Sequence, residues 1–195
     1  MEIGDIQEIS FLRLLPLLLC PLIFGIDFFG MNVLSPFIAK SLSVAPSRMH
    51  WIMTIFAIGY VGFIIAATRF ADYFGRRSLF LSSLFLFISS SLLCSQVSNF
   101  YIFLVGRFLQ GLSSGSMIML VLAYITTLFT GYKRKKYMGW LVGSAGLGFA
   151  IGPLIAGYFA DYFSWRAMFG INIFLAVFTF YTVYKIYPYR DLHED

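Results

Sequence analysis

The stretch FYIFLVGRFLQGLSSGSMIMLVLAYITTLF, residues 100–129, decides the fold class of this chain. It contains a single charged residue, Arg107. At a helical rise of about 1.5 Å per residue, such a run is long enough to cross roughly 30 Å of hydrocarbon. The stretch therefore predicts a membrane-spanning helix that holds one buried cation.

The rest of the chain has the same character. It is 59% hydrophobic and 12% charged, with a mean hydropathy of +0.83, so a soluble domain with a polar surface is excluded. We expect an all-α, polytopic membrane protein with one six-helix transmembrane domain over residues 1–195. The six predicted spans are 11–34, 51–70, 79–97, 100–129, 138–159 and 165–184.

The basic residues fix the expected orientation. Most lie in segments on the side of the N-terminus, and few lie in the segments between, which is the positive-inside pattern. We therefore expect both termini in the cytoplasm and a multi-pass protein of the cell (inner) membrane. The net charge of +5 follows this topology rather than a continuous face, which argues against a nucleic-acid partner. The expected inner set is Arg13, Arg69, Arg76, Arg77, Lys133, Arg134, Lys135, Lys136, Lys185 and Arg190, and the outer set is Lys40, Arg48 and Arg166.

Two charges, Asp27 and Arg107, lie well inside the predicted spans and are expected to be buried. Each lies about seven residues from the predicted outer end of its helix, so both are expected about 10 Å below the outer boundary, where they can pair. Asn32 and Gln110 add polar groups nearby. One interpretation is a structural salt bridge. The other is a protonation switch, since burial favours the neutral acid and a nearby arginine favours the carboxylate.

Glycine and serine gather in spans 100–129 and 138–159. Pairs such as Gly111/Gly115 and Gly148/Gly152 have the four-residue spacing that lets helices approach closely in lipid. Static packing explains any one pair. The accumulation beside Pro153 also favours a flexible or sliding helix.

Enzyme chemistry is not expected. The segment Gly111–Gly115 has the G-x-S-x-G spacing of a hydrolase, but that serine needs a histidine base. The two histidines, His50 and His193, are expected at a membrane boundary and in the C-terminal tail. No cluster of metal ligands is present in the sequence, and no metal or cofactor is expected.

Four motifs give the chain its resemblance to a known family. Residues 68–77, TRFADYFGRR, resemble the inner-loop signature G-x-L-A-D-R-x-G-R-R of the major facilitator superfamily, matched at Asp72, Gly75, Arg76 and Arg77. Arg107, Gln110 and Gly111 match its fourth-span pattern R-x-x-Q-G. The segment 148–157 resembles the antiporter pattern G-x-x-x-G-P-x-x-G-G through Gly148, Gly152, Pro153 and Gly157. Asp27, Asn32 and Pro36 match a first-span pattern, and Trp165, Arg166, Phe169 and Asn172 echo the sixth span.

The chain thus resembles the N-terminal six-helix half of a drug:proton antiporter, similar to multidrug exporters. The resemblance implies proton-coupled efflux of small organic compounds. It implies a proton-coupling or substrate role for Asp27, Asn32, Arg107 and Gln110. It also implies a conformational latch against the opposite half at Asp72, Gly75, Arg76 and Arg77, in which Asp72 caps or contacts a helix N-terminus and both arginines bind cytoplasmic carboxylates. Lipids, protons and a small-molecule substrate are the expected partners.

Family members combine two six-helix halves, so a second half or a homodimer is also expected. The sequence leaves three explanations open: a piece of a longer protein, a gene remnant, or a half-size subunit that dimerises. Two other functions stay open as well. One is a non-transporting module that assembles with or regulates another transporter, and the other is a facilitator-type importer of small metabolites.

Overall fold

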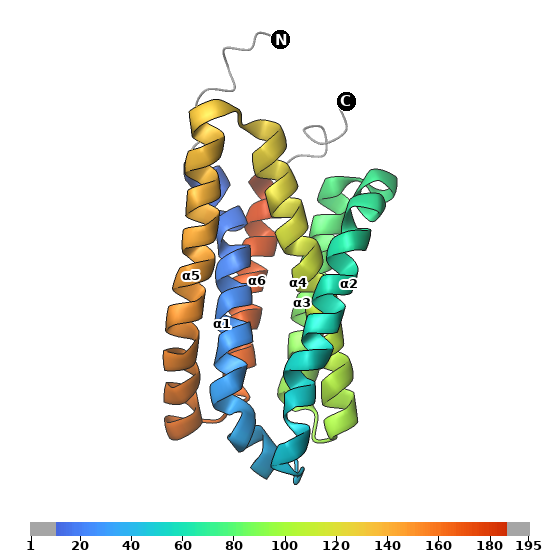
Figure 1. The fold of residues 1–195 in the computed structure, drawn as a ribbon, viewed down its shortest axis with the longest axis vertical. Helices are drawn as coiled ribbons and strands as arrows, with labels where there is room; N and C mark the ends of the chain where they lie inside the picture. Colours follow the sequence, from blue (N-terminus) through green and yellow to red (C-terminus); the bar gives the residue numbers. More distant parts are fainter. Residues whose placement is uncertain (1–10, 187–195) are drawn as a thin grey trace.

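The computed structural model describes residues 11–186, and this range forms a bundle of six long helices (Figure 1). All six are long and apolar enough to cross a membrane, which confirms the all-α, six-span architecture. The elements are α1 (Phe11–Ser41), the short 3₁₀ turn η2 (Pro46–Arg48), α2 (His50–Phe74), α3 (Arg76–Gln96), α4 (Phe100–Leu128), α5 (Gly131–Tyr162) and α6 (Ala167–Ile186).

Short, specific turns connect the helices. Gly75 alone separates α2 from α3, and its φ of 81° lies in the left-handed region that glycine adopts without strain. Asn99 precedes α4 and caps it, because its side-chain oxygen accepts from the backbone N–H groups of Tyr101 at 2.8 Å and Ile102 at 3.3 Å. Because these turns are short, α2 runs antiparallel to α3, and α3 runs antiparallel to α4.

Three predicted boundaries are wrong. The span predicted over 11–34 continues as α1 through Pro36 to Ser41. In lipid, one missing N–H costs less than the several unpaired backbone groups of an interrupted helix. The gap between the predicted spans 51–70 and 79–97 is reduced to Gly75, with Asp72 inside the last turn of α2. The helix predicted to begin at 138 begins at Gly131 as α5, because a helix can extend beyond the hydrocarbon core into water.

The helices pack in a defined order. α1 packs mainly against α5 and α6, α2 packs against α4, and α3 packs against α4 and α6. In Figure 1, α1, α2, α4 and α5 lie toward the viewer and α3 and α6 lie behind them. α1 and α4, with 61% of their apolar windows buried, form the centre, whereas α2 and α5 are 22% and 17% buried.

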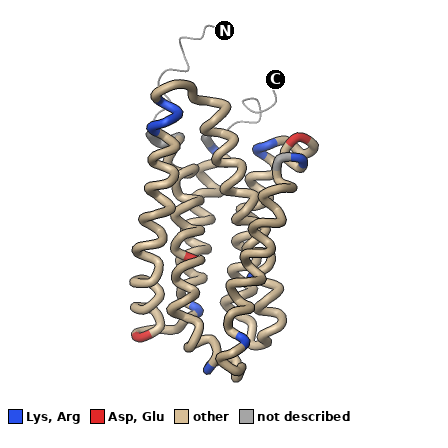
Figure 2. The backbone as a smooth tube through the Cα atoms, viewed as in Figure 1, with Lys and Arg blue, Asp and Glu red and all other residues tan. Residues whose placement is uncertain are grey.

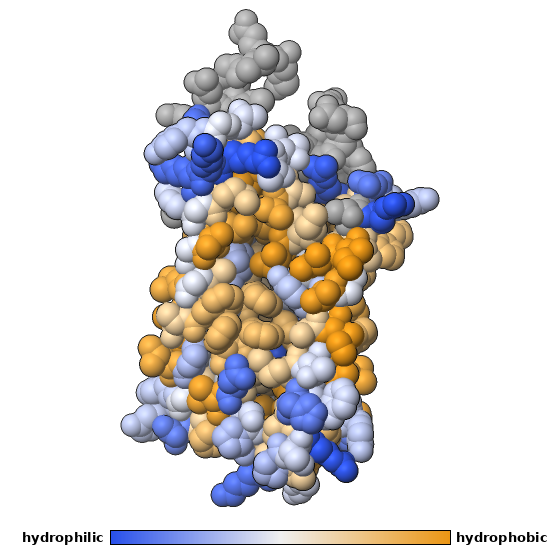
Figure 3. Space-filling model, viewed as in Figure 1, coloured by the Kyte–Doolittle hydropathy of each residue, from blue (hydrophilic) through white to orange (hydrophobic). Residues whose placement is uncertain are grey.

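Charged residues gather at the two ends of the bundle, and the backbone between them is almost free of charge (Figure 2). The face shown in Figure 3 is correspondingly apolar in its middle and hydrophilic near both ends. We call the end where α1 begins and α6 ends the basic end. Its described basic residues are Arg69, Arg76, Arg77, Lys133, Arg134, Lys135, Lys136 and Lys185, against Lys40, Arg48 and Arg166 at the opposite end.

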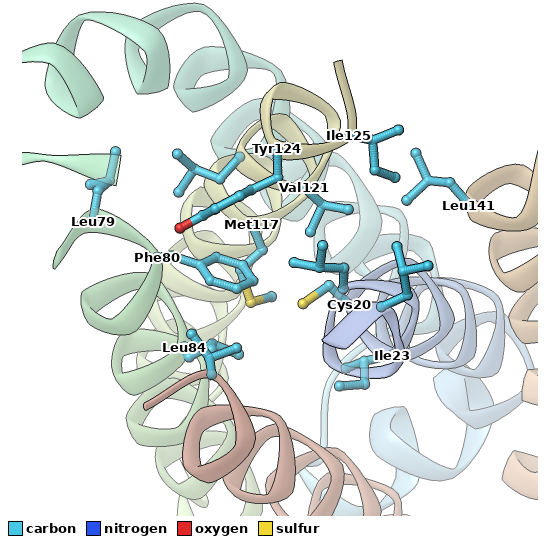
Figure 4. Packing of buried hydrophobic residues seen from close by; sticks show 14 of the residues in the cluster. Cys20, Ile23, Leu79, Phe80, Leu84, Met117, Val121, Tyr124, Ile125 and Leu141 are labelled. Atoms are coloured by element: carbon cyan, nitrogen blue, oxygen red, sulfur yellow. The ribbon is translucent and has the colours of Figure 1, made fainter. Parts of the chain in front are cut away.

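Two apolar clusters fill the interior, one toward each end. The cluster nearer the basic end joins α1, α3 and α4 through side chains such as Cys20, Phe80 and Val121 (Figure 4). The other cluster joins α1, α4 and α6 through Met31, Phe103 and Phe169. The polar residues described next lie between these clusters, so they are enclosed by apolar packing.

Candidate functional site

Asp27 and Arg107 form an ion pair at the centre of the bundle. Asp27 Oδ2 on α1 lies 2.6 Å from Arg107 Nη1 on α4, and both side chains are 0% exposed. This is the one ion pair among the residues that the structure describes. The structure thus brings together the two charges that the sequence placed at one depth.

Asn172 on α6 completes the coordination of the carboxylate. Its Nδ2 donates to Asp27 Oδ1 over 2.6 Å, and its side chain is fully buried. The expected second polar residue, Asn32, is instead exposed. Five residues at about 100° each place Asn32 roughly 140° around α1 from Asp27, so Asn32 lies on another side of α1 from the ion pair, and its proposed role in substrate binding stays a prediction.

Arg107 extends the network into α3. Its Nη1 also donates to Gln110 Oε1 over 2.8 Å, and Gln110 Nε2 donates to Ser91 Oγ over 2.7 Å. Gln110 therefore holds the position that the sequence predicted for it. The guanidinium also lies over the ring of Phe56 on α2, 4.4 Å from its centroid, a favourable contact for a buried cation.

The network is only partly satisfied. Arg107 Nε and Nη2 and Asn172 Oδ1 are buried and have no hydrogen-bond partner within residues 11–186. Buried polar groups usually have one, and an unpaired group costs free energy. The site therefore holds spare donors and a spare acceptor around a charge pair. Such an arrangement can accept a different set of hydrogen bonds if the charge on Asp27 changes.

Glycines allow the helices around the pair to come close. A Cβ on Gly152 of α5 would lie 2.8 Å from the carbonyl oxygen of Ile26, the residue before Asp27, and one on Gly148 would meet the Leu22 carbonyl. A Cβ on Gly111 of α4 would overlap the Phe56 carbonyl oxygen. A Cβ on Gly157 would make only an ordinary contact, with Val33 Cγ1 at 4.0 Å. Three of the four motif glycines thus bring α5 onto α1 and α2 onto α4 at the level of the site.

The predicted latch residues lie at the basic end. Asp72 is exposed, and α3 begins at Arg76 with Gly75 as its N-cap residue and no side-chain cap, so Asp72 does not cap that helix. Arg76 Nη1 donates to Thr127 Oγ1 at the end of α4 over 3.0 Å. Arg77 Nη2 donates to the carbonyl oxygen of Tyr184 on α6 over 3.1 Å. Within this chain, both arginines bind neutral groups.

Three residues of the site were not predicted as such: Asn172, Ser91 and Phe56. Asn172 is a lone polar residue in the apolar run 167–178, a signal that could have marked it as buried and functional. Ser91 and Phe56 carry no such signal, because serine and phenylalanine recur along these helices.

Six membrane-length helices around a buried ion pair define a polytopic α-helical membrane protein. The family profile of the Major Facilitator Superfamily matches residues 17–194. The chain belongs to this superfamily, as its motifs suggested.

Curated relatives include named transporters. The chain is 34% identical over 127 residues to the multidrug transporter protein MdtP of Bacillus subtilis, covering 65% of this chain and 24% of MdtP. It is 28% identical over 149 residues to the multidrug resistance protein Stp of Mycobacterium tuberculosis, covering 76% and 28%. It is 24% identical over 165 residues to the riboflavin transporter RibZ of Clostridioides difficile, covering 85% and 36%. The chain thus spans about a quarter to a third of the length of these relatives.

Proposed function

We propose that the chain forms part of a proton-coupled transporter that exports small organic compounds, with Asp27 and Arg107 as the proton-coupling pair. The observation that carries the proposal is the complete burial of this pair between α1 and α4. A charge inside the membrane is expensive and is usually retained for function. Relatives named as multidrug proteins support the substrate class.

The coupling step follows from the charges. With Asp27 ionised, the pair is neutral overall and holds α1 to α4. A proton on Asp27 leaves the charged guanidinium of Arg107 without a counter-charge. A buried, unpaired cation is costly, so the network must rearrange, with Gln110 as the acceptor already in contact. Protonation of Asp27 thus causes a change in how the helices pack.

α5 is the element best placed to respond. Gly152 packs directly on Ile26, beside Asp27, and Pro153 follows it within the helix. Small residues at a helix contact leave no interlocking side chains. We propose that this contact lets α5 slide or tilt when the pair breaks.

The turn around Gly75 is proposed as the conformational latch of the family. Arg76 joins the start of α3 to the end of α4, and Arg77 joins it to the end of α6. Asp72 and Arg76 line a small cavity of about 60 Å³ between α2 and α4. The exposed Asp72 is available to a second six-helix unit.

The excess of basic residues at one end supports the orientation. We propose that the basic end faces the cytoplasm of the cell membrane, with both termini on that side. The low burial of α2 and α5 supports contact of these helices with a second six-helix unit, either another half or a second copy.

The test uses this chain joined to the remaining part of MdtP and reconstituted in vesicles with an imposed pH gradient. Export of a cationic dye should require the gradient and should be abolished by Asp27→Asn. Asp161→Asn, which neutralises an exposed aspartate at the end of α5, is the matched control and should leave export unchanged. Export that persists in the Asp27→Asn protein would reject the assigned role.

Two alternatives use the same preparation. The likeness to RibZ favours a metabolite such as a flavin as substrate, which uptake of labelled riboflavin would detect. A module that regulates another transporter would give stable hetero-oligomers and no flux of either compound.

A further inference from the structure

A groove runs along α3 and α6 near the basic end. It encloses about 400 Å³ and is lined by Arg77, Ser78, Leu81, Ser82, Phe85 and Phe180. Arg77 and Ser78 lie at the start of α3, Leu81, Ser82 and Phe85 follow along that helix, and Phe180 belongs to α6. The groove therefore has a cation at one end and a phenylalanine ring on each of the two helices further into the span.

Its dimensions fit the boundary of a membrane. Arg77 is the second residue of α3, and Phe85 lies eight positions later, about 12 Å further along the helix axis. Phe85 is 64% exposed, and Phe180 is half-buried across the groove. A phosphate beside Arg77 would thus place the upper part of an acyl chain against the two phenylalanine rings.

The cation at the polar end of the groove is held in place. Arg77 Nη2 donates to the Tyr184 carbonyl, and the guanidinium carbon lies 5.5 Å from the centroid of the Tyr184 ring. No carboxylate within residues 11–186 pairs with Arg77. Lys185, stacked 4.7 Å over Tyr181, adds a second positive charge at this end of α6. Among the residues that the structure describes, the positive charge at the polar end of the groove thus has no paired carboxylate.

We propose that this groove is a binding site for an anionic phospholipid, with the headgroup phosphate at Arg77 and one acyl chain along Leu81, Phe85 and Phe180. Charge complementarity selects the phosphate, because basic side chains at a membrane surface attract anionic lipids. The apolar half of the groove selects a lipid over a soluble phosphate. This site is independent of the Asp27–Arg107 network and does not depend on the transport proposal.

Photo-crosslinking tests the site. A benzophenone amino acid replaces Phe85 in the 195-residue chain, which is reconstituted in vesicles of equal phosphatidylglycerol and phosphatidylcholine. The same label at Phe174, a 71% exposed residue of α6 that does not line the groove, reports bulk lipid. We expect an anionic-to-neutral crosslink ratio about fivefold higher at position 85, the factor for roughly one surface cation.

Charge variants assign the effect to Arg77. Arg77→Gln should return the ratio at position 85 to that at position 174, whereas Arg77→Lys should keep most of the enrichment. Arg134→Gln is the matched control, because Arg134 is an exposed cation of the same end on α5, and it should change nothing. Equal ratios at positions 85 and 174 in the unaltered groove would overturn the proposal, as would enrichment that survives Arg77→Gln or that Arg134→Gln removes equally.

If Arg77→Gln does not fold, judged by its elution in size exclusion, the salt dependence of the labelled parent protein decides. Raising the salt from 0.1 to 1 M should reduce the enrichment at position 85, because it shortens the screening length from about 10 to about 3 Å. An enrichment insensitive to salt would contradict recognition by charge.

Discussion

Asn172 and Asp27, 145 positions apart in the chain, are joined by a hydrogen bond of 2.6 Å in which the amide donates to the carboxylate oxygen that Arg107 does not contact. Each carboxylate oxygen thus has one donor, and the donors come from two different helices. Side chains of α4 and α6 thus both bind the carboxylate of Asp27 on α1. A change in the charge or position of this carboxylate therefore alters contacts of all three helices.

Replacement of Asn172 by leucine should therefore lower the stability of the bundle. It leaves one oxygen of a buried carboxylate without a donor, which typically costs about 1–3 kcal/mol. Thermal unfolding of the purified chain in detergent measures the effect. Asn32→Leu is the matched control, because Asn32 is exposed on the same helix as Asp27. If both variants melt alike, the hydrogen bond from Asn172 does not stabilise the fold.

The ion pair should show strong coupling between its two members. Asp27→Leu alone leaves Arg107 buried without a counter-ion, and a loss of about 3–5 kcal/mol is expected. Arg107→Met alone should cost a similar amount, for the same reason with the charges reversed. The double variant should recover most of this loss, because an apolar pair of similar volume removes both desolvation costs.

Denaturant unfolding of the four proteins completes this cycle and gives the interaction energy directly. Additive losses in the double variant would mean that the two side chains do not depend on each other. Recovered stability together with lost transport would separate the structural contribution of the pair from its proposed coupling role.

Much of the site could be predicted from the sequence because depth is a one-dimensional property. Counting residues from the ends of apolar runs placed Asp27 and Arg107 at one level, and the structure brings them together. Gln110, one turn from Arg107, followed from helical spacing. The glycine pairs also predicted close helix contacts, because residues four apart lie on the same face of a helix.

Counting residues does not give the rotation of each helix about its own axis, which decides the direction in which a side chain faces. Asn32 and Asn172 were both near the right depth by chain position, and only the packing of α1 against α6 decides which one faces Asp27. Helix ends were also uncertain, since hydropathy marks where the lipid ends and not where the backbone hydrogen bonds end. α1 therefore continues through Pro36, and α5 begins before the basic run at 133–136.

The glycines of α5 allow a matched test of helix contact. Gly152→Ala should lower the unfolding temperature, because the added Cβ would lie 2.8 Å from the Ile26 carbonyl and the helices would have to separate, at about 1–3 kcal/mol. Gly143→Ala should be neutral or stabilising by up to about 1 kcal/mol, because nothing lies within 4 Å of its added Cβ and alanine favours helix. Equal effects would show that α5 does not pack on α1 at Gly152.

Two arginines connect α3 and α6 reciprocally. Arg77 at the start of α3 donates to the Tyr184 carbonyl near the end of α6, and Arg166 just before α6 donates through Nη2 to the Val97 carbonyl after α3 over 2.8 Å. Cations near helix C-termini also interact favourably with the helix dipole. Each end of this antiparallel pair is thus closed by one guanidinium.

Arg166→Gln should weaken the contact between α3 and α6 at the end of the bundle opposite the basic end. Arg166 also contacts Ser41 Oγ at 3.3 Å, so the variant frees the end of α1 as well. For a half-buried residue at the membrane boundary, a loss of about 0.5–1 kcal/mol is expected, which corresponds to amide exchange about two- to fivefold faster around Val97 and Ser41. Hydrogen–deuterium exchange of the reconstituted chain measures this.

Arg48→Gln, at an exposed position of the same end, is the matched control and should leave amide exchange around Val97 and Ser41 unchanged. Faster exchange in the Arg48 variant, or none in the Arg166 variant, would mean that helix packing alone holds this end closed.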